Sequence, residues 1–262
     1  MNRTGLAIAL LVGVGVGVVF GFWPQLDIAI SRLFFDEARS TFPALQSLVS
    51  RHLRDLFTYV VAALAAPAFI ALVVKLVLPR RRMLVSARAV LFLIATLALA
   101  PGLMTNVILK DNWHRPRPGE VTQLGGPEQF MPWWDPRGAC DKNCSFVAGE
   151  GSGAFWTLAP AALVAPAWLP VAYGAALMLG AAAGLQRISG GAHFFSDVVF
   201  SGVFTFLIIW AVHGLIYRWR TRLTDEQVER VIDRVALPPH EALQRLFARL
   251  CAMLGLGVGG RP

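Results

Sequence analysis

The sequence predicts an all-α integral membrane protein: a six-helix bundle with a surface helical segment after the first span and a helical cytoplasmic tail. Of its 262 residues, 56% are hydrophobic and only 15% are charged. Several apolar runs reach the roughly 20 residues that a helix needs to cross the hydrocarbon core of a bilayer. This composition excludes an ordinary soluble domain, and it excludes disorder over most of the length.

The first apolar run extends from Gly5 to Trp23. It is longer than the core of a signal peptide and no small-residue cleavage site follows it, so we interpret it as a transmembrane helix. Residues Pro24 to Asp55 mix apolar and charged side chains, which predicts a helical segment at the membrane surface. Five further spans are predicted, at Leu56–Leu78, Ala89–Leu109, Gly149–Trp168, Pro170–Leu185 and Phe194–Tyr217. No charged residue separates the fourth span from the fifth, so their boundary is the least marked.

The last span is followed by a different kind of segment. Arg218, Arg220 and Arg222 stop the apolar run, so we expect a six-span domain over residues 1–222. Beyond it, residues 223–262 form an amphipathic tail in which apolar side chains recur at helical spacing. Pro238 and Pro239 interrupt this pattern, which predicts a pair of surface helices.

Charge sets the predicted orientation. The connection from Lys75 to Arg88 holds five cations and no acids, whereas the connection from Lys110 to Glu150 holds five cations and six acids. The positive-inside rule therefore places the first connection, the arginines at 218–222 and both termini in the cytoplasm. The polar ends at Lys110, Glu150 and Arg187 then meet at the opposite face of the membrane.

The net charge of +8 could indicate a nucleic-acid partner, but the sequence contains no nucleic-acid-binding motif. In a membrane protein, such an excess is more typical of cytoplasmic loops and of contact with anionic lipid. We therefore expect a membrane partner and no nucleic acid, and protein partners are left open.

Two polar stretches at the outer face could hold an anion. The first, K-D-N-W-H-R-P-R-P from Lys110 to Pro118, concentrates cations on a backbone stiffened by proline, which suits phosphate. The alternative is a positive collar at the membrane edge. The second, C-S-F-V-A-G-E-G-S-G from Cys144 to Gly153, leads into a helix whose free N–H groups can bind an anion. The alternative is an ordinary helix start, with Glu150 and Ser152 in its first turn.

The third polar stretch, G-L-Q-R-I-S-G-G-A-H-F-F-S-D, carries Arg187, His193 and Asp197. The last two are four residues apart, so on a helix they share a face and can form a hydrogen bond. A carboxylate behind a histidine fixes its tautomer and leaves the other ring nitrogen free to act as base or nucleophile. The alternative is a polar helix end at the membrane surface.

Cys140 and Cys144 lie close together in the long polar loop. We predict that they form a disulfide, because the charge pattern places this loop outside the cytoplasm. A metal site is disfavoured, since no third or fourth ligand accompanies them at a familiar spacing.

Together the three stretches resemble the type 2 phosphatidic acid phosphatase family, whose signature is K-x6-R-P, then P-S-G-H, then S-R-x5-H-x3-D. The matching positions in the outer two motifs are Lys110, Arg117, Pro118, Arg187, His193 and Asp197. The middle motif matches only at Gly149, and the departures are Val147, Ala148 and Glu150 for its proline, serine and histidine, and Gln186 for the serine of the third motif.

The resemblance implies a metal-independent phosphatase without a cofactor. His193 would attack phosphorus to form a phosphohistidine, and Asp197 would orient it. The groups implied to hold the phosphate are Lys110, Arg117, Arg187 and Gly149, with Ser152 as a further candidate. Glu150 would replace the histidine that protonates the leaving oxygen, and His114 is the alternative acid.

The resemblance also implies a lipid phosphate or diphosphate substrate, and a bacterial inner-membrane protein whose site faces the periplasm. Candidate substrates are lipid A, undecaprenyl diphosphate and phosphatidylglycerol phosphate. The aromatic- and glycine-rich loop from Gly119 to Asn143 favours the bulky headgroup of lipid A. Two alternatives remain: phosphotransfer from one lipid to another through the same phosphohistidine, and non-catalytic binding of a lipid phosphate with Glu150 marking a lost acid.

Overall fold

The computed structural model describes residues 1–219 and 223–253. Within these residues the chain is helical, with two isolated β-bridges and no strand. Five of the described helices are long and apolar enough to cross a membrane: Arg3–Phe22, Leu48–Val77, Ala87–Leu109, Pro166–Ser189 and Phe195–Arg218. The prediction of an all-α membrane protein is therefore confirmed.

The described residues form fifteen helical elements, several of which differ from the predicted ones. In chain order they are α1 (Arg3–Phe22), α2 (Gln25–Arg32), α3 (Pro43–Gln46), α4 (Leu48–Val77), α5 (Ala87–Leu97), the π-helix η1 (Ala98–Leu109), the short 3₁₀ turns η2 (Pro118–Glu120) and η3 (Thr122–Leu124), α6 (Gly149–Phe155), α7 (Leu158–Ala161), the 3₁₀ turn η4 (Pro166–Trp168), α8 (Leu169–Ser189), α9 (Phe195–His213), the π-helix η5 (Gly214–Arg218) and α10 (Asp225–Met253).

Polar caps start three of the long helices. The side chain of Asn2 accepts a hydrogen bond from the N–H of Gly5 at 2.9 Å, and Ser47 and Ser86 cap α4 and α5 in the same way. Such caps satisfy one of the N–H groups that a helix start leaves without a partner. The apolar residues that follow supply the length of each span.

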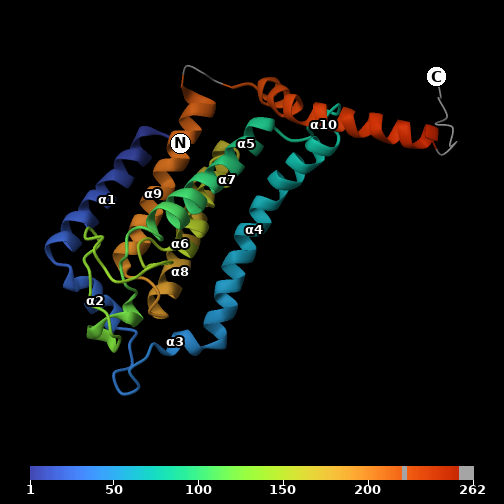
Figure 1. Ribbon diagram of the computed structural model, residues 1–262. Helices are drawn as coiled ribbons and strands as arrows, with labels where there is room; N and C mark the ends of the chain where they lie inside the picture. The colour runs from blue at the N-terminus through green and yellow to red at the C-terminus, as the bar shows by residue number, and fades with distance from the viewer. Residues whose placement is uncertain (220–222, 254–262) are drawn as a thin grey trace.

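The helices pack side by side (Figure 1). The N-terminus and α10 lie at one end of the bundle, and α2, α3 and the long loop after η1 lie at the other. The N-terminal end of α4 adjoins α3, and its C-terminal end lies beside α10. The polar stretches and the tail therefore occupy opposite ends of the molecule.

The predicted fourth span, Gly149–Trp168, is not one helix. It consists of α6, α7 and η4, and none of these is long enough to cross a membrane alone. Pro160 and Pro166 lie within this stretch, and each lacks the N–H that a continuing helix needs. Apolar composition predicted the segment correctly but could not show where the helix breaks.

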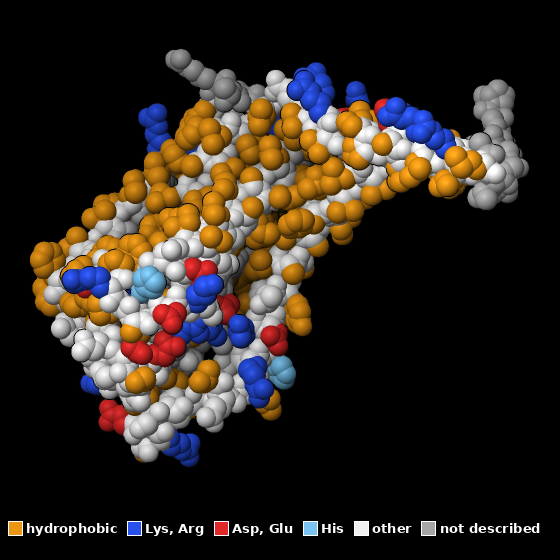
Figure 2. All heavy atoms as spheres, in the orientation of Figure 1, with side chains coloured by type: hydrophobic (Ala, Val, Ile, Leu, Met, Phe, Trp, Pro, Cys, Tyr) orange, Lys and Arg blue, Asp and Glu red, His pale blue; other side chains and the backbone are white. Residues whose placement is uncertain are grey.

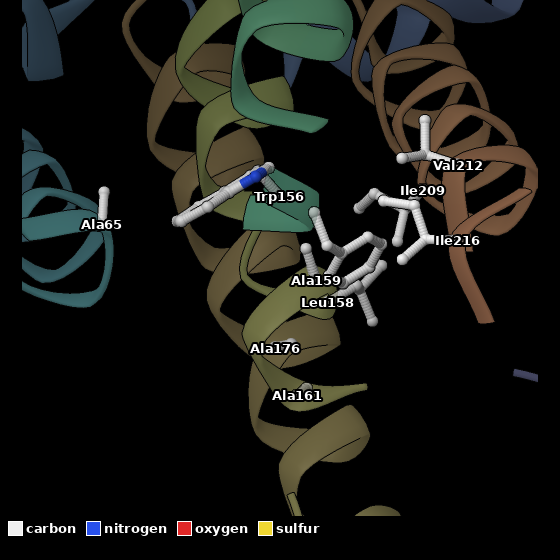
Figure 3. Close-up of a cluster of buried hydrophobic side chains, with 10 residues drawn as sticks. Ala65, Trp156, Leu158, Ala159, Ala161, Ala176, Ile209, Val212 and Ile216 are labelled. Carbon is white, nitrogen blue, oxygen red and sulfur yellow. The ribbon is translucent and has the colours of Figure 1, made fainter. Parts of the chain in front are cut away.

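A hydrophobic cluster holds the broken segment against the long helices (Figure 3). Trp156, between α6 and α7, is fully buried and donates its indole N–H to the hydroxyl of Thr96 at 3.0 Å. Glycine allows the neighbouring helices to approach closely. A Cβ at Gly180 of α8 would lie 2.2 Å from a ring carbon of Phe155, so no larger residue fits there.

The segment after α1 differs from the surface helix predicted over Pro24–Asp55. Its last residues belong to α4, which begins at Leu48 and so starts the second span earlier than predicted. Its first helix, α2, is partly internal, because Asp27 and Ser31 are buried. A carboxylate inside a membrane protein requires partners, and α2 therefore bears on the site.

The tail is also simpler than predicted. α10 is one continuous helix through Pro238 and Pro239 rather than a pair of helices. It is tied to α4 by Lys75, which is 4% exposed and whose Nζ lies 2.8 Å from Asp233 and 3.5 Å from Glu229. Arg220, Arg222, the domain boundary after residue 222 and residues 254–262 lie outside the described residues.

Candidate active site

Three polar stretches that are distant in sequence meet at the loop end of the bundle. Figure 2 shows acidic and basic side chains gathered there, on a surface that is otherwise largely hydrophobic. They surround a cavity of about 870 Å³. Its lining includes the predicted residues Lys110, Arg117, Gly149, Glu150 and Arg187. Each of these residues lies at the end of a helix or in a loop, where its polar side chain need not be buried between packed helices.

One loop residue, Asn143, holds two of these cations. Its side-chain oxygen accepts from Lys110 Nζ at 2.9 Å, and its carbonyl accepts from Arg117 Nη2 at 2.6 Å. The backbone of Asn143 has φ of 54°, a left-handed conformation that asparagine tolerates better than most residues. Burial lowers the pKa of Lys110, and Arg117 and Arg187 add to that shift, while Glu150 opposes it.

Gly149 allows Lys110 to approach the start of α6. A Cβ at this position would lie 3.1 Å from Lys110 Nζ and 3.2 Å from Asn106 Oδ1. Both distances are tighter than ordinary contact, so a larger residue would push the lysine out of place. The glycine of the middle motif thus has a packing role in the cavity wall.

His193 is fully buried behind Glu150, in the turn that precedes α9. Its Nδ1 lies 2.7 Å from the carbonyl oxygen of Ser145. A carbonyl only accepts, so Nδ1 carries the hydrogen and Nε2 keeps its lone pair. Among the described residues Nε2 has no hydrogen-bond partner, and its nearest acid is Glu150 Oε2 at 4.0 Å.

The charge of His193 follows from its surroundings. Burial lowers the pKa of the imidazole well below its ordinary value, and the nearby cation of Lys110 lowers it further. The ring is therefore neutral at pH 7. A neutral imidazole with a free nitrogen is the form of histidine that can act as a nucleophile.

The structure corrects the expected role of Asp197. Its Oδ2 is 4.0 Å from His193 Nδ1, too far for a hydrogen bond, because His193 lies before the helix rather than on it. Instead Asp197 accepts from Ser145 Oγ at 2.5 Å and from the N–H of Phe194 at 2.8 Å. The carboxylate thus acts on the histidine through Ser145, a residue that the sequence analysis did not single out.

Behind Asp197 lies a second corrected residue. Arg115, which the sequence groups with the cations of the first stretch, is fully buried and pairs with Asp197 and with Asp27 of α2. Its Nη2 lies 2.8 Å from Asp27 Oδ2. Asp27 also accepts from the N–H and the hydroxyl of Ser196, at 3.0 and 2.5 Å. Arg115 therefore holds the support of the site and does not line the cavity.

Glu150 lies in the first turn of α6, outside the five long spans. Its Oε1 is 2.9 Å from Arg54 Nη2, and its Oε2 is 3.6 Å from Arg187 Nε. Burial raises the pKa of this carboxyl, but the cations of Arg187 and Lys110 and a backbone hydrogen bond outweigh burial and lower it to about 2. Glu150 is therefore ionised at neutral pH. Arg54, on α4, was not predicted from the sequence.

The two further candidates do not reach the cavity. His114 lies 2.8 Å from the carbonyl of Cys140 through its Nδ1, within the loop. Ser152 is buried in the bundle, 3.0 Å from the hydroxyl of Thr105 and 2.8 Å from that of Thr205. Both side chains serve local structure.

The same loop contains the predicted disulfide between Cys140 and Cys144, which the structure confirms. In residues 1–219 and 223–253, no group of three or more His, Cys, Asp or Glu side chains is arranged to hold a metal ion.

The cavity has a polar end and an apolar side. Beyond the cations, its lining continues along α4 through Phe57, Val61, Ala65 and Phe69. An anionic group and an adjoining acyl chain could therefore occupy it together, and a water-soluble phosphate would leave the apolar part unfilled.

Comparison with known proteins supports a common origin with phosphatases. The sequence model of the PAP2 superfamily matches residues 88–222. A protein named lipid A 4′-phosphatase from Francisella tularensis subsp. novicida (strain U112) is 45% identical over 132 residues, which are 50% of this chain and 60% of the relative. No solved structure matches the chain.

Two further relatives carry the same name. The protein from Rhizobium leguminosarum is 36% identical over 47% of this chain and 52% of its own length. The protein from Rhizobium etli (strain ATCC 51251) is 32% identical over 47% of this chain and 48% of its own length. The chain spans about half the length of the curated relatives it matches.

Proposed function

Because the chain belongs to the PAP2 superfamily, we propose that it is a membrane lipid phosphatase that removes a phosphate from lipid A at the outer face of the bacterial inner membrane. The family match confirms the resemblance found in the three motifs. The observation that carries the proposal is the neutral His193, whose Nε2 has no hydrogen-bond partner among the described residues and lies 4.0 Å from Glu150, a residue of the cavity wall. The names of the three relatives support lipid A as the substrate.

The reaction begins with attack of His193 Nε2 on phosphorus. The N–P bond forms as the bond from phosphorus to the lipid oxygen breaks, and the leaving oxygen takes a proton from Glu150. Lys110, Arg117 and Arg187 hold the phosphoryl oxygens and stabilise the charge that spreads over them. Water then attacks phosphorus while the Glu150 carboxylate takes its proton, the P–N bond breaks with its electron pair returning to His193 Nε2, and inorganic phosphate leaves.

Glu150 must be protonated for the first of these steps, although its pKa in the free protein is lowered to about 2. A dianionic phosphate bound between the same cations both screens them and repels the carboxylate. Each effect raises the pKa of Glu150. The substrate therefore favours the protonated form of the proton donor, and the carboxylate left after the first step accepts the proton of the attacking water.

The polar and apolar parts of the cavity support a lipid over a soluble phosphate. The phosphate lies by the cations, and an acyl chain lies along α4 beside Phe57, Val61 and Phe69. In this arrangement the substrate reaches the site from the membrane.

The test is phosphate release by the purified full chain from lipid A, undecaprenyl diphosphate and phosphatidylglycerol phosphate, with His193→Ala as control. We expect release from lipid A, in chelator and without added metal, and none from the variant. Labelled phosphate that appears on a second lipid would indicate a phosphotransferase. Binding without release from any of the three would indicate a non-catalytic binder.

We further infer that the chain crosses the membrane six times. The predicted fourth span, with the short helices α6 and α7, makes the fourth crossing, and residues 1–222 form one membrane domain. Both termini then face the cytoplasm and the active site faces the periplasm. The balance of charge between the connections supports this orientation.

The amphipathic tail, residues 223–262, lies on the cytoplasmic surface in this arrangement. The described part of it, α10, exposes the apolar side chains of Val231, Val235, Leu243, Leu246, Phe247 and Leu250. Figure 2 shows hydrophobic side chains along the side of α10 nearer α4, and Lys and Arg side chains on the other side. Such a helix suits the boundary between headgroups and acyl chains.

A further inference from the structure

We propose that Arg54 is a positioning residue for Glu150, so that the first turns of α4 belong to the active site. The inference rests on the proposed function. Arg54 lies outside residues 88–222, the part of the chain that the superfamily model matches. Its Nη2 is 2.9 Å from Glu150 Oε1, and it lines the same cavity as Lys110 and Arg187.

The two polar departures from the family motifs both contact α4. Gln186, where the third motif has serine, donates to the carbonyl and the hydroxyl of Ser50 at 3.2 and 2.8 Å. Glu150, where the middle motif has histidine, accepts from Arg54, one turn further along. Ser50 and Arg54 are four apart and so share a face of α4. The two departures from the family motifs, Gln186 and Glu150, therefore both contact the same face of α4.

The geometry shows what Arg54 does to the carboxylate. It binds one oxygen of Glu150 and leaves the other facing His193 Nε2 at 4.0 Å and Arg187 Nε at 3.6 Å. The second oxygen thus points to the place where phosphorus must lie for attack by His193. Without Arg54, the carboxylate is free to turn toward the remaining cations.

Exposure argues for a role in the reaction rather than in stability. The Arg54 side chain is 52% exposed and that of Glu150 is 25% exposed. Ion pairs at such exposure contribute little to folding. Displacing a catalytic group by about 1 Å, in contrast, can reduce a rate by about 100-fold.

The experiment compares Arg54→Gln, Arg54→Lys and the control Arg51→Gln, an exposed arginine one turn earlier on the same helix. We expect Arg54→Gln to lower kcat on lipid A by about 10- to 100-fold with a smaller change in KM. Arg54→Lys should recover part of the loss, and Arg51→Gln should match the wild type. The loss should be smaller on p-nitrophenyl phosphate, whose leaving group needs no proton.

A double-mutant cycle separates positioning from direct binding of phosphate. In the Glu150→Gln background, Arg54→Gln should cost nothing more, because the group on which it acts is gone. An undiminished loss there would show that Arg54 binds the phosphate itself and would overturn the proposal. So would an Arg54→Gln enzyme with wild-type kcat on lipid A. A folded wild-type protein that releases no phosphate would instead sink the proposed function, and this inference with it.

Discussion

Glu150 carries a negative charge that one step of the proposed reaction requires it to lose. The pKa of about 2 in the free protein reflects the cations of Arg187 and Lys110 and a backbone hydrogen bond, which together outweigh burial. A bound phosphate dianion lies among the same cations and offsets their charge, so it raises the pKa of Glu150 again. In the proposed mechanism, Glu150 therefore acts as an acid only when substrate is bound.

We predict that Glu150→Gln lowers the rate of phosphate release from lipid A by about 10²- to 10⁴-fold, the usual contribution of one acid–base group. Glu150→His should retain more activity, because it restores a group that titrates. The measurement is kcat on lipid A and on p-nitrophenyl phosphate, which should be less affected. Wild-type rates for Glu150→Gln on both substrates would show that Glu150 transfers no proton in the reaction and serves only as part of the start of α6.

The pH dependence of kcat/KM should report the lowered pKa of His193. Burial and Lys110 hold this pKa well below 6.5, so the neutral nucleophile persists to lower pH than an ordinary histidine. We expect the acidic fall in kcat/KM, after correction for the substrate phosphate whose second pKa is about 6, to lie below pH 6.5. An acidic limb centred at 6.5 or above would contradict a buried, neutral His193.

For single residues, the sequence motifs predicted several residues of the cavity. They did not predict the residues that reach the cavity only through packing of the folded chain. Lys110, Glu150 and Arg187 surround one cavity, as their places at span ends predicted. Asn143 and Arg54 reach the same cavity through contacts that no local spacing encodes. The spacing of His193 and Asp197 suggested a helix, but the turn at Gly191, with φ of 65°, places the histidine before it.

Among the elements, α2 contributes more than its amphipathic sequence suggested. It brings Asp27 to the buried Arg115, which in turn holds Asp197. Without the Asp27 carboxylate, Arg115 would keep Asp197 as its partner, but the buried Arg115 Nη2 and Ser196 hydroxyl would lose the oxygen that accepts from both. The support of the active site therefore reaches back to the first connection of the chain.

We predict that Asp27→Asn destabilises the protein by about 1–3 kcal/mol, the usual cost of leaving a buried hydrogen-bond donor without an acceptor. The control is Glu37→Gln, whose side chain is 75% exposed and lies 3.8 Å from Arg32. Such a surface pair contributes at most about 1 kcal/mol. Thermal unfolding in detergent measures both variants, and equal stabilities would show that Asp27 is not needed to balance Arg115.

Apolar composition predicts which segments cross the membrane, but it does not predict where a helix breaks within such a segment. The long helices lie close to their predicted ranges, because 20 apolar residues leave few alternatives in a bilayer. The stretch from Gly149 to Trp168 has the same composition but breaks into short helices. α10, in contrast, continues through Pro238 and Pro239, where proline predicted a break.

For the whole molecule, orientation in the membrane is the main expectation to test. We predict that Cys251 of α10, which is not in the disulfide, reacts with a membrane-impermeant maleimide only after the inner membrane is permeabilised. The matched control carries Arg39→Cys in a Cys251→Ser background, at a side chain that is 78% exposed at the opposite end. It should react in intact spheroplasts. The reverse pattern would invert the proposed topology.

The apolar lining along α4 has a consequence for how such a protein meets its substrate. A protein whose cavity binds an acyl chain together with a phosphate meets its substrate within the bilayer and not in the surrounding water. The encounter is then governed by lateral diffusion and by the mole fraction of substrate among the other lipids. Adding inert lipid at constant total substrate dilutes the substrate within that plane, and turnover slows although no bulk concentration has changed.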